Sequence, residues 1–100
     1  MRMDGRTRVM WWLLEGSRGG TARKKILAAL LLRPQNTHQL SKVVSMDYKT
    51  VEYHLRILLE NEMVTKTGGE YGAVYFVSTF AEEHRELFST ASKDGGSGVT

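Results

Sequence analysis

The sequence predicts a single α+β domain that is mainly helical, with three core helices, a two- or three-stranded β-wing and a closing carboxy-terminal helix. Its 100 residues suffice for one domain with a modest core. Apolar side chains recur at helical spacing in three successive segments between residues 22 and 61. Two runs rich in β-branched and aromatic residues, 63–67 and 73–77, then bracket a glycine-rich connection, which is typical of a hairpin.

The amino-terminal segment is polar and basic, and we expect residues 1–8 to form a flexible arm. The apolar run from Val9 to Leu14 follows, and it is too short to distinguish a strand from the end of a short helix. It is also too short for a signal peptide or a membrane span, so we expect a cytoplasmic protein with no membrane contact. The folded domain is expected over 9–88. The Ser-, Gly-, Lys- and Asp-rich segment 89–100 is expected to be a disordered tail.

The first long helix is predicted from Ala22 to Arg33. The glycine-rich segment 16–20 is a break that permits a tight chain reversal, and Thr21 is the expected cap. Pro34 ends the helix, because the residue before a proline is pushed out of the helical region. The side chains expected to face inward are Ile26, Leu27, Ala29 and Leu30.

Two further helices form a helix-turn-helix. Asn36 or Thr37 caps the first, which runs to about Val44, and Asp47 caps the second, which runs to Asn61. The turn at 45–46 between them contains no glycine. The expected buried side chains of the pair are Leu40, Val43, Val44, Val51, Leu55, Leu58 and Leu59.

The opposite face of the 47–61 helix carries side chains suited to DNA. Lys49 and Arg56 are suited to phosphates or guanine edges, and Thr50 to a phosphate or a thymine methyl group. The face as a whole comprises Tyr48, Lys49, Thr50, Tyr53 and Arg56. His54 lies beside the buried stripe, where we expect a partly buried, hydrogen-bonded imidazole with a structural role.

A hairpin directly after a helix-turn-helix is a wing, so the predicted fold is a winged helix-turn-helix. Lys66 is the expected phosphate partner on the wing, whose tip at 68–72 either contacts DNA or is simply an exposed loop. Ser78 or Thr79 then begins a helix in which Phe80, Leu87 and Phe88 share one face.

The charge distribution places the basic residues away from the predicted recognition helix. The net charge is +3, but residues 1–33 carry eight Lys/Arg against two acidic residues, and residues 34–79 carry four against five. We therefore expect Arg18 and Lys24, with the arginines of the arm, to help neutralise phosphates. There is no cysteine, and neither a metal site, another cofactor nor a catalytic arrangement is predicted.

Three strings carry a resemblance to a known family. They are GSRGG at 16–20 with Arg23, RPQNTHQL at 33–40, and DYKTVEYHL at 47–55. Together with the order of elements, they resemble winged-helix transcription regulators of the ArsR-like kind, most closely the archaeal members. The resemblance covers roughly residues 11–88. It implies sequence-specific binding to double-stranded DNA and, by family habit, repression of a promoter. The Cys-containing motif of the metal-sensing members is absent, so arsenic or cadmium sensing is not expected.

Several large apolar side chains lie outside the predicted helix-turn-helix core, and we expect them to form a homodimer interface. They are Trp11, Trp12, Leu13, Phe80, Leu87 and Phe88. Core packing accounts for some of them. The alternative function is a winged helix that contacts another protein in a larger assembly, because the recognition helix carries little positive charge. The sequence predicts neither the operator nor an effector.

Overall fold

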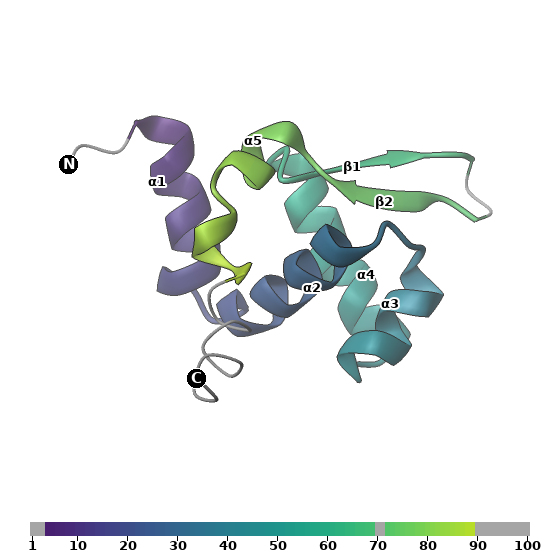
Figure 1. Ribbon diagram of the computed structural model, residues 1–100. Helices are drawn as coiled ribbons and strands as arrows, with labels where there is room; N and C mark the ends of the chain where they lie inside the picture. Colours follow the sequence, from purple (N-terminus) through teal and green to yellow (C-terminus); the bar gives the residue numbers. More distant parts are fainter. Residues whose placement is uncertain (1–3, 70–71, 90–100) are drawn as a thin grey trace, which may run out of the picture.

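The protein has a mainly helical α+β fold with a two-stranded wing, which confirms the predicted winged helix-turn-helix. The computed structural model describes residues 4–69 and 72–89. In chain order the elements are α1 (Gly5–Trp11), the π-helical turn η1 (Trp12–Gly16), α2 (Gly20–Leu32), α3 (Thr37–Val44), α4 (Tyr48–Glu60), β1 (Val64–Thr67), β2 (Val74–Val77), α5 (Thr79–Glu83) and the 3₁₀ turn η2 (Arg85–Leu87). Figure 1 shows α1 at one end of the molecule and the hairpin projecting from the other.

Capping side chains place the ends of α3 and α4. Asn36 accepts from the Gln39 amide at 2.8 Å, and the Gln39 side chain accepts from the Asn36 amide at 2.9 Å, which makes a capping box. Asp47 caps α4 by accepting from the Thr50 amide at 3.2 Å. Ser45 makes the turn between the helices with a φ of 58°, so a non-glycine residue adopts the left-handed conformation there. Asn36 and Asp47 are therefore confirmed as caps.

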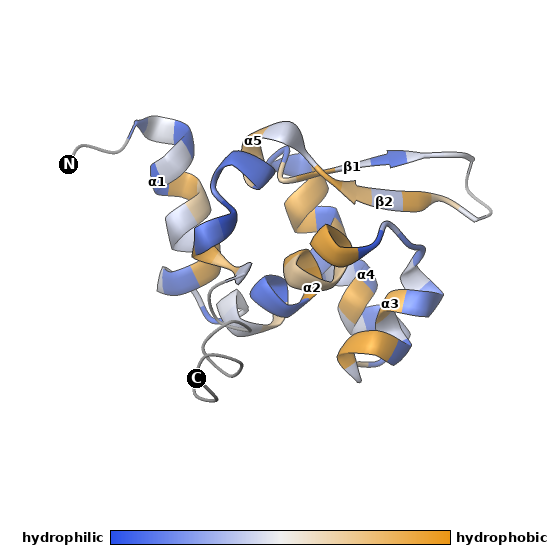
Figure 2. Ribbon diagram, viewed as in Figure 1, coloured by the Kyte–Doolittle hydropathy of each residue, from blue (hydrophilic) through white to orange (hydrophobic). Residues whose placement is uncertain are grey.

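The core lies where α2, α3 and α4 meet, and α1, β1 and the carboxy-terminal turns cover it. All four predicted α2 positions are buried, as are Leu40, Val51, Leu55 and Leu58. Val43 is 61% exposed, so its prediction as a core residue is wrong. Val44 and Leu59 are half-buried against the core. In Figure 2 the hydrophobic colour recurs on α2, α3, α4 and β2, with hydrophilic stretches between.

The wing is an antiparallel hairpin in which Val64 pairs with Val77 and Thr67 with Val74. A single bridge adds the loop before α3, because Gln35 and Tyr75 exchange backbone hydrogen bonds of 3.3 and 2.9 Å. This bridge fixes the hairpin against the start of α3. The tip residues 70–71 lie outside the described part of the chain. Gly68 and Gly72 flank them with positive φ values of 89° and 76°, which glycine adopts at no steric cost.

Residues 5–8 are helical, so the predicted flexible arm is wrong for this part of it. Asp4 caps α1 by accepting from the Thr7 amide at 2.8 Å. The apolar run that follows continues as helix, and its Met10 and Leu14 are buried in the core. Burial at spacing i and i+4 holds the segment as a helix rather than a strand. Residues 1–3 and the tail 90–100 lie outside the described residues.

Two further predicted boundaries change. Helix α2 begins at Gly20, with Gly19 as a cap that makes no side-chain hydrogen bond, so Thr21 is not the cap. The closing helix is capped by Ser78, which accepts from the Ala81 amide at 3.1 Å, but it ends after Glu83. A 3₁₀ turn follows. No helix among the described residues is both long and apolar enough to cross a membrane.

Candidate nucleic-acid interface

The exposed face of α4 carries four of the five residues predicted to contact DNA. Tyr48, Lys49, Tyr53 and Arg56 are exposed, and they lie opposite the buried Val51, Leu55 and Leu58. The Arg56 guanidinium lies 6.0 Å from the centre of the Tyr53 ring, so these two side chains form one patch. The four polar and aromatic residues therefore all face solvent from α4.

Thr50 differs from the other four because it is half-buried. Its hydroxyl donates to Asp47 Oδ1 at 2.6 Å, so the donor is used in capping α4. The methyl group and the oxygen lone pairs remain the parts of Thr50 that can face a ligand.

A cleft of about 310 Å³ lies between the start of α3, the first turns of α4 and the hairpin. Lys66 lines it from β1 and Tyr48 from α4, so the structure brings the predicted wing contact to the same side as the recognition helix. Thr37, His38 and Glu52 also line this cleft. Our sequence interpretation did not select these three. Thr37 and His38 could have been selected from the sequence because they begin the helix before the recognition helix. In a helix-turn-helix that preceding helix crosses the DNA backbone.

Glu52 gives the cleft a mixed charge. It is exposed on α4 between Tyr48 and Arg56 in sequence, and it shares the cleft with Lys66. A carboxylate is repelled by phosphates but accepts a hydrogen bond from the amino group of cytosine. The cleft therefore suits reading of base edges better than neutralisation of the backbone.

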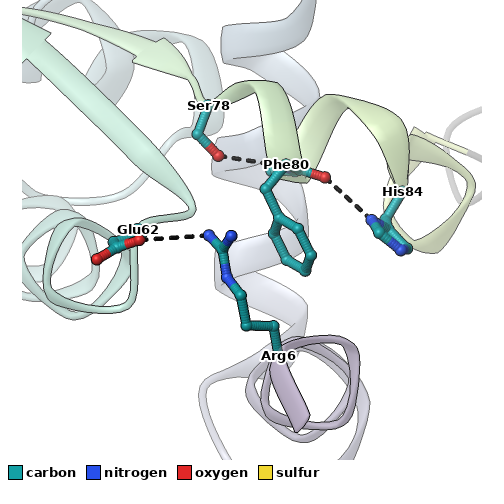
Figure 3. Close-up of polar contacts among 6 residues, drawn as sticks. Arg6, Glu62, Ser78, Phe80 and His84 are labelled. Carbon is teal, nitrogen blue, oxygen red and sulfur yellow. Dashed lines mark hydrogen bonds and ion pairs between the residues drawn. The ribbon is translucent and has the colours of Figure 1, made fainter. Parts of the chain in front are cut away.

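The basic residues of the amino-terminal third do not all remain free for phosphates. The Lys24 ammonium is 2.9 Å from Glu15 in an ion pair. The Arg6 guanidinium lies 3.9 Å above the centre of the Phe80 ring and 3.4 Å from Glu62, at the base of the wing (Figure 3). Arg18 is exposed and lines a separate groove beside Trp12 and Tyr53.

His54 is buried and makes a hydrogen-bonding contact, as its predicted structural role requires. It is 7% exposed, and its Nδ1 lies 3.1 Å from Nη1 of Arg23 on α2. Burial lowers the pKa of His54, and the adjacent Arg23 charge lowers it further. Among the described residues no three of His, Asp and Glu gather in a way that would hold a metal ion.

Two of the residues predicted to form a dimer interface are instead part of the monomer core. Leu13 is 4% exposed and Phe88 is fully buried, so placing them on a subunit surface is wrong. Phe80 and Leu87 are half-buried against the core. Trp11 and Trp12 remain at the surface, 43% and 55% exposed. Of the residues predicted to form a dimer interface, these two tryptophans on α1 and η1 are therefore the most exposed.

The three-helix core, the hairpin and the exposed face of α4 define a winged helix-turn-helix domain. The model of the family described as bacterial regulatory protein, arsR family, matches residues 21–66. This match spans nearly all of α2, the helix-turn-helix and most of β1. No curated protein matches the chain in sequence.

Solved structures with the same fold come from several bacteria. Reduced HlyU from Vibrio cholerae N16961 matches with a TM-score of 0.65 at 21% identity, over 80% of this chain and 82% of its own. The MarR family transcriptional regulator SPO1453 from Silicibacter pomeroyi DSS-3 matches with a TM-score of 0.70 at 11% identity, over 94% and 69%. Streptococcus pneumoniae FabT in complex with DNA matches with a TM-score of 0.66 at 15% identity, over 92% and 69%. These likenesses show the winged-helix fold of the chain.

Proposed function

We propose that this chain is a sequence-specific DNA-binding transcriptional regulator. The observation that carries the proposal is the cleft in which Tyr48 and Glu52 of α4 meet the start of α3 and the hairpin. A helix with this face has the shape that enters the major groove, while a wing follows the adjacent backbone. The match to the arsR family model and the DNA complex among the solved structures support this function.

Each exposed side chain has a role in this proposal. Lys49 and Arg56 reach base edges or phosphates from positions two turns apart on α4, and Tyr48 and Tyr53 donate their hydroxyls to phosphates. Lys66 on β1 contacts the backbone beside the groove. The fold and the matched family model are those of transcription regulators rather than enzymes.

The test is selection of bound duplexes from a random DNA pool, followed by gel shifts of the selected duplex at low salt. Replacing Lys49 and Arg56 together by Ala should weaken binding by at least about tenfold, since one lost base contact costs about 1–3 kcal/mol. Arg85→Ala is the control for Arg56→Ala alone, because each removes one exposed positive charge and Arg85 lies in the carboxy-terminal turn η2. The proposal fails if the parent protein binds no duplex, or if the double variant binds as tightly as the parent.

We further propose a homodimer that contacts itself through the exposed side chains of α1 and η1. Trp11, Trp12 and Val9 are the large apolar side chains exposed there, and aromatic residues are enriched at protein interfaces. A twofold dimer would present two α4 helices to a near-palindromic site. Sedimentation at tens of micromolar, an order of magnitude suited to weak association, should show a dimer that Trp12→Ala disrupts. Sedimentation of the parent only as a monomer would contradict this.

The resemblance stated from the sequence adds finer expectations to this proposal. It implies a regulator of the archaeal ArsR-like type that represses transcription from its target promoter. It also implies a cytoplasmic location. The alternative is a winged helix that contacts another protein, which the acidic Glu52 on the recognition face favours. The gel shift separates the two functions, since a protein-contact module would select no DNA sequence.

A further inference from the structure

The buried guanidinium of Arg23 joins three elements beneath the recognition helix. Arg23 lies in the first turn of α2 and is 4% exposed. Its Nε donates to the Leu13 carbonyl of η1 at 3.0 Å, and its Nη2 donates to Ser17 Oγ at 2.6 Å. Its Nη1 meets Nδ1 of His54 on α4 at 3.1 Å. The same side chain thus connects α2, the η1 segment and α4.

The contact between Arg23 and His54 requires a neutral imidazole. A guanidinium has only donors, so Nδ1 of His54 must accept, and the ring proton lies on Nε2. These three partners of Arg23 are uncharged groups, a carbonyl, a hydroxyl and an imidazole. A buried charge surrounded by neutral acceptors depends on every one of them, because losing a partner leaves the charge unsatisfied.

The charged groups around His54 do not offset a second positive charge. Arg18, from the loop before α2, lines the groove beside the pair and adds positive charge. Glu15 of η1 is already paired with Lys24 of α2. On α4 itself Tyr53 contacts the imidazole edge-on at 5.1 Å between ring centres. Glu60 lines the groove, but it is six residues further along α4, about 9 Å along the helix axis.

Gly19 limits how far the two side chains can move. A Cβ atom at this position would lie 2.5 Å from Nη1 of Arg23 and 2.7 Å from Cε1 of His54. The pair therefore fills the space that a side chain at position 19 would occupy. The backbone of Gly19 thus closes one side of the pair, and the His54 ring borders a groove on another side.

We infer that Arg23 and His54 are positioning residues that hold the recognition helix α4 against α2, and that α4 is placed for DNA only while His54 is neutral. The inference rests on the proposed function for its DNA readout. A proton on Nδ1 removes the acceptor and sets two positive charges 3.1 Å apart in a buried position. Helix α4 then shifts relative to α2, which it crosses in the core (Figure 1). Binding to a selected duplex is then weakened, because the side chains of α4 reach the base edges only when the helix keeps its position in the groove.

The experiment compares His54→Gln with its parent in a chain where His38 and His84 are both replaced by Gln. Because His38 lines the cleft, the duplex is one selected with this same background. The chain has three histidines, so His54 is then the only one. In His54→Gln the side-chain amide does not titrate, so position 54 stays neutral at every pH. The dissociation constant of the parent for its selected duplex should rise by up to about tenfold per pH unit once His54 protonates, since one proton is linked to binding. The His54→Gln variant should hold its pH 7.5 affinity to within about twofold down to pH 5, the scatter expected without a linked proton. Identical pH profiles for the two proteins overturn the inference.

A second measurement follows the protein without DNA. NMR titration of the parent should show the backbone amides of residues 50–56 shifting together with the His54 imidazole, and these amide shifts should be absent in His54→Gln. Amides that do not follow the imidazole overturn the inference, whatever the gel shifts show. If no duplex is selected but the amides follow His54, the positioning role stands and the DNA-binding proposal fails.

Discussion

Replacing Gly20 by Ala tests the close approach of η1 and α2. Gly20 is the first residue of α2 and is buried. An added Cβ would overlap the Leu14 carbonyl oxygen and lie 2.7 Å from the carbonyl carbon. Both atoms belong to backbone, so no side-chain rotation relieves the overlap. Either η1 or the start of α2 must move, and Leu14 is part of the buried core.

The magnitude follows from two opposing effects. Ala in place of Gly within a helix ordinarily stabilises by about 0.5–1 kcal/mol. Overpacking of a buried position costs about 1–3 kcal/mol. A backbone overlap lies toward the upper end of that cost, so we expect a net loss of about 1–2 kcal/mol in the free energy of unfolding. For a domain of this size, each kcal/mol corresponds to about 4–8 °C in Tm.

Urea unfolding followed by the fluorescence of Trp11 and Trp12 measures this loss. Gly5→Ala is the matched control, because Gly5 also begins a helix but no atom lies within 4 Å of its added Cβ. The control should be neutral or up to about 1 kcal/mol more stable. A Gly20→Ala protein as stable as its parent, beside a control that behaves as expected, would refute the close approach of the two backbones.

Three further outcomes follow from the interface and its supports. Glu52→Gln should change the selected DNA sequence at one position, because the carboxylate that accepts from a base is lost. It should also raise the affinity for random duplex about two- to tenfold, because a charge repelled by phosphates is removed. An unchanged selected sequence would place this side chain outside the groove. Asp47→Asn keeps a capping oxygen but removes the negative charge that the hydrogen bonds from Thr50 stabilise. The parent should therefore be more stable than Asp47→Asn near pH 6. That advantage should vanish as the pH falls through the pKa of Asp47, which hydrogen bonds from Thr50 lower; urea unfolding at several pH values measures it, and a constant difference would contradict the argument. Arg23→Met should raise the pKa of His54 toward its ordinary value of about 6.5, because a neighbouring positive charge is lost. NMR titration would show a pKa that is unchanged or lower if Arg23 contributes nothing to it.

The predictions that were confirmed depend on interactions between residues close together in the sequence. The stripe of Val51, Leu55 and Leu58 was confirmed because helix periodicity alone places these residues on one face. Asn36 and Asp47 were confirmed as caps because a cap satisfies amides within three residues of itself. Val43 shares the apolar character of such positions but is exposed. In a helix as short as α3, one or two turns of pattern do not determine which apolar residue faces the core.

The candidate interface was predicted in part for the same reason. The four exposed residues of α4 that were predicted to contact DNA follow from the phase of the helix. Glu52 lies on the same helix, and the helix phase also places it at the surface. It was not predicted to contact DNA because a carboxylate is repelled by phosphates. Its place in the cleft depends on where the hairpin and the start of α3 come to lie. The Gln35–Tyr75 bridge sets that arrangement, and it joins residues forty positions apart in the sequence.

The sequence by itself determined the order of α2, α3 and α4, the caps of α3 and α4, the hairpin and the outward face of the recognition helix, since each depends on residues a few positions apart. Tertiary structure alone decided which charges are available. The Arg6 guanidinium lies against Phe80 and Glu62, and Arg23 is buried against His54 thirty-one residues away. Tertiary structure also decided that Leu13 and Phe88 belong to the core. These outcomes depend on which distant segments come together, and no local pattern of residues records that.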